Sequence, residues 1–315
     1  MALHPYFQNL VEQTKGQPPR SAGSPGTARA LTAAGCQRLG PGPAMAEKRD
    51  LTLPGRGGRI PARLFIPHGA EDALIVFYHG GGWVLGTPED YDSQVSALAE
   101  AARIPVLFVD YRLAPEHPFP AAADDAEDAM AAVLSGGLPG LPEGPVIVMG
   151  DSAGGNLTAV VCNALPEKGR VALQVLYYPV TDSDFTRASY SAYGTDHLLT
   201  AADMRWFFDH YVPDPAQRSD PRVAPLRHPR PGGPAVPALI VTAECDVLRD
   251  EGTAYAEALR SAGCPVTLRE VPGMAHVFLR HHAQVPEAAA DLAETAAQIR
   301  QAAGLPPLTA PPARS

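Results

Sequence analysis

Continuous apolar runs alternate with helical patterns along most of the chain, and this alternation constrains the fold more than any other feature of the sequence. The apolar runs have the character of strands buried on both faces of a sheet. We expect strands at residues 63–67, 73–78, 105–109, 146–149, 172–178, 238–242 and 266–271. We expect helices at 90–103, 121–134, 157–165, 250–262 and 286–303. Strands that alternate with helices of about ten to fifteen residues indicate an α/β protein with a mostly parallel sheet.

One long stretch, residues 179–237, interrupts the alternation. It has no convincing strand, many Pro and Asp residues, and one helical pattern at 200–211. Such an excursion between two sheet strands is typical of a functional lid. We therefore divide the chain into an N-terminal arm or cap segment (1–45), a core domain (46–303) with a cap insertion at about 181–236, and a flexible tail (304–315).

The charge and composition of the chain exclude several classes of function. The net charge is −9, which disfavours nucleic-acid binding through a basic face. No window reaches the roughly 18 apolar residues of a membrane span, and residues 1–20 lack the pattern of a secretory signal. Four cysteines lie far apart without a C-x-x-C spacing, as expected for free thiols in a reducing cytoplasm. We therefore predict a cytoplasmic protein without a membrane span and without nucleic acid as a partner.

A G-x-S-x-G motif follows the expected strand at 146–149 and precedes a helical pattern. It comprises residues 150–154 (G-D-S-A-G), with Ser152 at its centre. The strand–turn–helix setting is that of a nucleophile elbow, in which a sharp turn lifts the serine hydroxyl clear of the sheet. The alternative is a glycine-rich turn in which Ser152 caps the helix. We predict that Ser152 is a nucleophile.

A second glycine motif, residues 79–83 (H-G-G-G-W), ends the expected strand at 73–78. Successive glycines leave backbone N–H groups free to converge on one oxygen, as an oxyanion hole requires. We predict an oxyanion hole from Gly80, Gly81, Gly82 and Ala153, with donation from the last three and Gly80 shaping the turn. A phosphate-binding loop is the rival, but the Lys-Ser/Thr pair and the further glycine it needs are missing. We expect His79 to be structural.

The remaining catalytic groups should follow later strands. Four carboxylates lie after the strand at 238–242, and we choose Asp246 because Asp250 and Glu251 suit the start of the next helix. His276 lies in the loop after the strand at 266–271. The chain order Ser, Asp, His, each residue after its own strand, predicts a catalytic triad. Such a triad hydrolyses acyl compounds through an acyl-enzyme and needs no cofactor or metal.

Taken together, these motifs resemble the hormone-sensitive-lipase-like, bacterial family IV carboxylesterases of the α/β-hydrolase superfamily. The matching motifs are residues 79–83, 109–116 (V-D-Y-R-L-A-P-E), 150–155, 246–252 (D-V-L-R-D-E-G) and 273–276 (G-M-A-H), with further similarity at 193–211 and 220–226. The resemblance covers roughly residues 50–300, and the motifs occur in the family's order. Cys245 before the acid and Ala275 beside the base are small departures.

The resemblance implies an α/β-hydrolase fold: an eight-stranded, mostly parallel sheet with an antiparallel second strand, flanked by helices and covered by a helical cap. It implies hydrolysis of short- to medium-chain carboxylic esters, a small-molecule ester as the partner, and a homodimer. It carries over Ser152 as nucleophile, Asp246 as acid, His276 as base and the glycine-loop amides as oxyanion hole. Candidate substrate contacts are Trp83, Asp151, Leu198 and Phe207.

Two other functions stay open. The same triad would serve a deacetylase or amidase that acts on a specific metabolite. A ligand receptor on a hydrolase scaffold is the third reading, which the presence of His276 disfavours. Asp110, Arg112 and Glu116, in a proline-bent loop, are expected to form structural ion pairs and not a charged active site.

Overall fold

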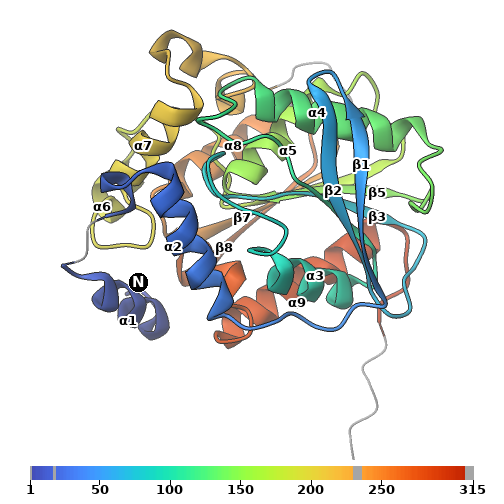
Figure 1. The fold of residues 1–315 in the computed structure, drawn as a ribbon, viewed down its shortest axis with the longest axis horizontal. Coiled ribbons are helices and arrows are strands. Elements are labelled where there is room, and N and C mark those ends of the chain that lie inside the picture. Colours follow the sequence, from blue (N-terminus) through green and yellow to red (C-terminus); the bar gives the residue numbers. More distant parts are fainter. Residues whose placement is uncertain (1, 17–18, 230–235, 309–315) are drawn as a thin grey trace, which may run out of the picture.

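The computed structural model describes residues 2–16, 19–229 and 236–308 of the 315-residue chain. Its centre is an eight-stranded sheet with the strand order β1-β2-β4-β3-β5-β6-β7-β8 (Figure 1). β2 is antiparallel to both of its neighbours, and the strands from β4 to β8 are parallel. The expected eight-stranded, mostly parallel sheet with an antiparallel second strand is therefore confirmed.

The strands are β1 (Glu47–Gly55), β2 (Gly58–Ile66), β3 (Leu74–Tyr78), β4 (Val106–Val109), β5 (Val146–Asp151), β6 (Val171–Tyr177), β7 (Ala238–Cys245) and β8 (Val266–Ala275). The α-helices are α1 (Pro5–Thr14), α2 (Pro25–Gln37), α3 (Asp92–Ala102), α4 (Ala121–Ser135), α5 (Ala153–Ala164), α6 (Ala188–Tyr193), α7 (Ala201–Tyr211), α8 (Arg249–Ser261) and α9 (Pro286–Ala302). Short 3₁₀ helices are η1 (Arg20–Ala22), η2 (Pro215–Ser219), η3 (Pro225–Arg227) and η4 (Phe278–His281).

Helices cover both faces of the sheet, which explains the continuous apolar runs. α4, α5 and α8 lie on one face, and α3 and α9 lie on the other (Figure 1). Successive residues of β3 point alternately into the two layers: Leu74 and Val76 join the core under α4 and α5, whereas Ile75 and Phe77 join the core under α3 and α9. Both sides of such a strand are apolar because neither side faces water.

β1 was not predicted from the sequence. It pairs only with β2 at the edge of the sheet, and Leu53 is its one buried residue. An edge strand with one covered face needs few apolar residues, and its charged side chains discourage pairing with other chains. The polar sequence of β1 therefore did not indicate a strand.

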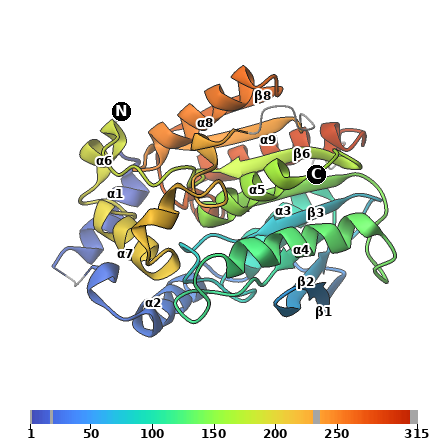
Figure 2. The same cartoon turned by 90° about the horizontal axis from the view of Figure 1, so that it is seen from above.

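The N-terminal arm and the stretch of residues 179–237 after β6 lie together at one end of the molecule. This end contains α1, α2, α6 and α7 (Figures 1 and 2). The arm contacts the excursion directly, because the Ser21 N–H donates to the Asp203 carboxylate at 3.2 Å. Asp203 also forms a capping box with Thr200 at the start of α7. Residues 230–235 of the expected cap and 309–315 of the expected flexible tail lie outside the described residues. Within the ranges described, no helix is both long and apolar enough to cross a bilayer.

Candidate active site

Ser152 stands on a sharp turn between β5 and α5. Its backbone has φ 57° and ψ −118°, a region that L-residues rarely adopt. Gly154, two residues later, passes so close to the backbone of Tyr78 on β3 that a side chain would not fit there. The small residues of the motif therefore let the turn close against the neighbouring strand. The strand–turn–helix setting expected around Ser152 is present.

The side chains of Ser152, His276 and Asp246 form a hydrogen-bonded chain. His276 Nε2 lies 2.9 Å from Ser152 Oγ, and His276 Nδ1 lies 2.6 Å from Asp246 Oδ2. The other Asp246 oxygen accepts the backbone N–H of Leu248 at 3.0 Å. All three side chains are buried. The carboxylate can hold the imidazole in one orientation, and the imidazole can accept the serine proton.

The competing carboxylates after β7 have other partners. Asp250 pairs with Arg249 at 2.8 Å, and the Glu244 carboxylate accepts the Gly273 N–H at 2.7 Å. Glu251 turns away to the backbone of Thr181, whose N–H it accepts at 2.8 Å. Of these four groups, Asp246 is the one that reaches His276.

The three amides that are predicted to donate to the oxyanion are available. Within the described part of the chain, no group accepts a hydrogen bond from the amides of Gly81, Gly82 or Ala153. Gly80 differs, because its N–H donates to Asp151 Oδ1 at 2.9 Å. Gly80 is predicted to shape the turn and not to donate to the oxyanion, and its amide, which donates to Asp151, fixes the loop in agreement with that role.

Sequence reasoning missed the support behind this loop. The second oxygen of Asp151 accepts a hydrogen bond from the Tyr91 hydroxyl at 3.2 Å. The guanidinium of Arg280, on η4, lies over the Tyr91 ring at 4.1 Å from its centroid. Burial raises the pKa of Asp151, while the nearby Arg280 charge lowers it. No sequence signal could have found this cluster, because its members come from three distant segments.

His79 is structural, as expected. Its ring stacks on Tyr111 at 4.2 Å and on Phe108 at 5.1 Å, and its Nδ1 lies 2.7 Å from the Gly80 carbonyl oxygen. Burial lowers the pKa of His79 to about 3, so the ring is neutral near pH 7. A neutral, packed imidazole stiffens the start of the glycine loop.

Two of the four residues predicted to contact substrate have side chains that are engaged in contacts within the protein. Trp83 is 0% exposed and stacks on Tyr211 at 4.3 Å, so its ring belongs to the core. Asp151 is also 0% exposed, and both of its oxygens hold the contacts given above. The expectation that Trp83 and Asp151 contact substrate through their side chains therefore has no support, and we replace it with a structural role.

The other two candidates, Phe207 and Leu198, pack near the predicted site without an ion pair or hydrogen bond from their side chains. The Phe207 ring, on α7, packs so closely over Gly82 that a Cβ there would overlap it. Leu198 is half-buried against the core cluster that includes Tyr178 and Phe278. Phe207 therefore borders the predicted oxyanion hole, and both residues stay candidates for substrate contact.

Two of the three charged residues in the proline-bent loop form ion pairs with other segments, whereas Asp110 has no ion pair among the described residues. Arg112 pairs with the buried Asp125 of α4 at 2.8 Å, and Glu116 pairs with Arg29 of α2 at 2.6 Å. These contacts tie the loop to the core and the arm. The expected structural role of Arg112 and Glu116 agrees with these contacts. The described residues include no cluster of His, Cys, Asp and Glu placed to hold a metal ion.

Comparisons with known proteins identify the family of the chain. The family model for the α/β-hydrolase fold matches residues 75–280. The chain is 44% identical to carboxylic ester hydrolase LipN of Mycobacterium tuberculosis over 80% of this chain and 69% of the relative. It is 41% identical to ethyl acetate hydrolase of Pseudomonas putida over 76% of this chain and 78% of the relative.

Among solved structures, a hyperthermophilic esterase of the archaeon Pyrobaculum calidifontis superimposes with a TM-score of 0.89 at 34% identity. The superposition covers 96% of this chain and 99% of the esterase. The family model, the two relatives and the solved structure all belong to one group of enzymes. The chain therefore belongs to the hormone-sensitive-lipase-like carboxylesterases of the α/β-hydrolase superfamily.

Proposed function

We propose that the protein is a serine carboxylesterase that hydrolyses short- to medium-chain esters through an acyl-enzyme on Ser152. The observation that carries the proposal is the continuous hydrogen-bonded chain from Ser152 through His276 to Asp246, beside three unoccupied backbone amides. A nucleophile, a base and oxyanion donors at one place are what acyl transfer to a hydroxyl requires.

Acylation uses the contacts already described. His276 Nε2 accepts the Ser152 proton while Oγ attacks the ester carbonyl carbon. The carbonyl oxygen becomes an oxyanion, which the amides of Gly81, Gly82 and Ala153 stabilise by donating hydrogen bonds. The imidazolium that forms is stabilised by Asp246 and then protonates the leaving alcohol.

Deacylation repeats the sequence with water. His276 takes a proton from a water molecule as its oxygen attacks the acyl carbon, and the same amides hold the second oxyanion. The acid leaves when Ser152 recovers its proton from His276. These steps need only side chains and backbone groups of this chain.

A restricted acyl pocket is supported by the cap. Phe207 packs over Gly82 next to the predicted oxyanion hole, and its neighbour Phe208 is fully buried. A large ring fixed at this position shortens the space beside the scissile carbonyl. We therefore propose that short and medium acyl chains fit better than long ones.

The test is a series of p-nitrophenyl esters from acetate to palmitate, compared by kcat/KM. The proposal predicts a maximum among the short and medium esters and a steep fall toward palmitate. Rates that rise steadily toward palmitate would contradict the acyl preference. Absence of turnover on every ester, with a folded protein, would contradict the function itself.

The second candidate function is a deacetylase or amidase for a specific metabolite. The same His276 that protonates an alcohol could protonate a leaving amine, which is the demanding step in amide cleavage. Matched ester and anilide substrates with the same acyl group separate the two candidates. A kcat/KM for the anilide that equals or exceeds the value for the ester would favour the amidase.

Location and assembly complete the proposal. We propose a cytoplasmic location, because the four cysteines are all free thiols.

We also propose a homodimer, because β8 ends the sheet with one unpaired edge. Light scattering coupled to size-exclusion chromatography tests the assembly, and a monomeric mass would reject it.

A further inference from the structure

Tyr178 directly follows β6 and has a backbone conformation that tyrosine rarely adopts. Its φ is +34°, in the left-handed region that is unfavourable for residues with a side chain. Two other residues at the triad share this property: Ser152 has φ +57°, and Val277, directly after His276, has φ +61°. Residues held in such conformations persist where the surrounding structure fixes them, and they cluster at active sites. The backbone of Tyr178 therefore indicates a role in the site.

The residues on either side of Tyr178 hold the backbone of the proposed nucleophile. The Ser152 N–H donates to the Tyr177 carbonyl oxygen at 2.8 Å, and the Val180 N–H donates to the Ser152 carbonyl oxygen at 3.2 Å. Tyr178 donates its own N–H to the carbonyl oxygen of Val241, on β7, at 2.6 Å. These three hydrogen bonds fix the segment in place, so the direction of the Tyr178 side chain is fixed as well.

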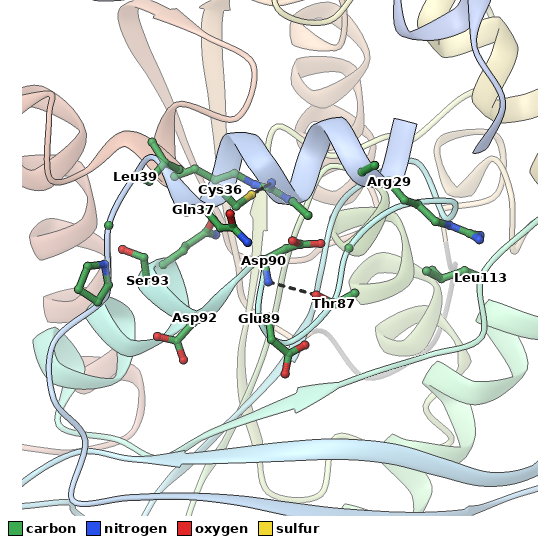
Figure 3. Close-up of a pocket in the computed structure, with 17 residues that line it drawn as sticks. Arg29, Cys36, Gln37, Leu39, Thr87, Glu89, Asp90, Asp92, Ser93 and Leu113 are labelled. Atoms are coloured by element: carbon green, nitrogen blue, oxygen red, sulfur yellow. Dashed lines mark hydrogen bonds between the residues drawn. The ribbon is translucent and has the colours of Figure 1, made fainter. Parts of the chain in front are cut away.

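The side chain of Tyr178 packs against the proposed base. Its ring centroid lies 4.8 Å from that of the His276 imidazole, with 59° between the ring planes. The Phe278 ring makes an edge contact with Tyr178 at 5.5 Å. Tyr178 is 1% exposed, and it does not line the cavity of about 620 Å³ between α2 and residues 86–94 (Figure 3). Because packed interiors resist displacement, an imidazole that turned toward Tyr178 would collide with its ring.

The hydroxyl of Tyr178 takes no part in these contacts. It is buried and has no hydrogen-bond partner among the described residues. Burial, and to a smaller extent the Asp151 carboxylate, raises the pKa of Tyr178 well above its ordinary value of 10.0, so the hydroxyl is neutral near pH 7. A tyrosine whose hydroxyl is neither bonded nor charged acts through its ring.

We propose that Tyr178 is a positioning residue for His276, whose imidazole it keeps turned so that Nε2 faces Ser152 Oγ. Because Tyr177 and Val180 hold the Ser152 backbone, one short segment sets both ends of the 2.9 Å contact between Nε2 and Oγ. The ring therefore acts on proton transfer and not on ester binding. This role rests on the proposed function, since it concerns the same nucleophile and base.

Two variants separate the ring from the hydroxyl in steady-state kinetics on p-nitrophenyl butyrate. Tyr178→Leu removes the ring, and we expect kcat to fall at least about tenfold with KM within about twofold, because a small misplacement of a catalytic group is costly. Tyr178→Phe keeps the ring, so its kcat should stay within about threefold of wild type. A wild-type kcat in the leucine variant, or an equal loss in both variants, would overturn the proposal.

A matched control separates positioning from a general loss of stability. Tyr255, on α8, is also fully buried, but its core cluster includes none of the three triad residues. Both Tyr178→Leu and Tyr255→Leu should lower the melting temperature, whereas only Tyr178→Leu should lower kcat when both are assayed well below melting. Equal losses of kcat would assign the effect to stability and overturn the proposal.

Tyr178→Met keeps the proposal testable if the leucine variant does not fold. Methionine fills irregular space with a flexible chain, so it can support the core without holding the imidazole in one orientation. We expect kcat to fall at least about fivefold in this variant. A folded methionine variant with wild-type kcat would overturn the proposal.

Proton NMR tests the orientation of His276 without turnover. The proton between His276 Nδ1 and Asp246 Oδ2, which lie 2.6 Å apart, should give a low-field signal in wild type and in Tyr178→Phe. The signal should broaden or vanish in Tyr178→Leu, because a turning imidazole exchanges this proton with water. A sharp signal in the leucine variant would overturn the proposal. A wild-type protein without ester turnover would refute the proposed function instead, and the NMR comparison would still decide the role of Tyr178.

Discussion

The Asp151 carboxylate accepts a hydrogen bond from the backbone N–H of Gly80 at 2.9 Å, and this contact joins the nucleophile turn to the oxyanion loop. Asp151 directly precedes Ser152, and Gly80 directly precedes the first of the free amides. The contact therefore fixes the distance between the attacking oxygen and the donors that receive the oxyanion.

Removal of this contact should lower kcat more than it changes KM. Asp151→Ala leaves the Gly80 N–H buried without an acceptor, and we expect kcat to fall about tenfold or more. Asp151→Asn keeps an oxygen that can accept from Gly80 and should recover most of the rate. Steady-state kinetics on p-nitrophenyl butyrate give both values. A wild-type kcat in the alanine variant would mean that the contact does not position the loop.

Gly82 should not tolerate a side chain. Its φ is +61°, and a Cβ would overlap the Phe207 ring, so Gly82→Ala must displace the predicted oxyanion donor. We expect kcat to fall about 10²–10³-fold, as for loss of one oxyanion-hole donor. Gly69 has a similar φ of +68° with open space around it, so Gly69→Ala is the matched control. The control should lose about 1 kcal/mol of stability at constant kcat. Equal kcat in both variants would refute the assigned role of Gly82.

The substitution Asp246→Asn should strongly reduce kcat. An asparagine can hold His276 with the wrong nitrogen protonated, and the corresponding loss in other serine hydrolases is about 10⁴-fold in kcat. Asp250→Asn changes a carboxylate four residues away that pairs with Arg249, and it should keep kcat within about tenfold. If the Asp250 variant were the more damaged of the two, the assignment of the acid would be reversed.

The raised pKa of Glu251 predicts that the stability of the protein depends on pH. Burial raises its pKa to about 8 in the folded chain, from an ordinary value of 4.5. The folded state therefore binds this proton more tightly than the unfolded state, so the stabilisation is fully present below about pH 4.5 and is lost as pH rises toward about 8. Glu251→Gln stays neutral and keeps an oxygen for the Thr181 amide. Urea unfolding across this pH range should show a free energy of unfolding that falls more steeply in wild type than in the variant. Identical slopes would contradict the prediction.

Much of the fold could be predicted from the sequence because its central strands are buried on both faces. β3 and β5 are uniformly buried, and each ends in a glycine motif whose local shape follows from backbone sterics. These signals are local, so the positions of Ser152 and the glycine loop followed from them. β1 carried no such signal, since an edge strand exposes most of its side chains. The short helix α6 was missed because six residues show little periodicity.

The site was less predictable where its contacts join distant segments. Trp83 is a candidate substrate contact in the sequence, but packing against Tyr211 of the cap buries it completely. The pairing of Gly80 with Asp151 depends on the adjacency of β3 and β5 in the sheet. Neither contact has a sequence pattern, because both are set by tertiary packing.

Ser152 is the proposed nucleophile, and the kcat of Ser152→Ala on p-nitrophenyl butyrate is the decisive measurement. The variant removes one oxygen from a turn whose backbone geometry is fixed by its neighbours, so the protein should fold with an unchanged melting temperature. We expect kcat to fall about 10⁴–10⁶-fold, as for nucleophile removal in other serine hydrolases. A folded Ser152→Ala variant whose kcat stays within about tenfold of wild type would mean that Ser152 is not the nucleophile.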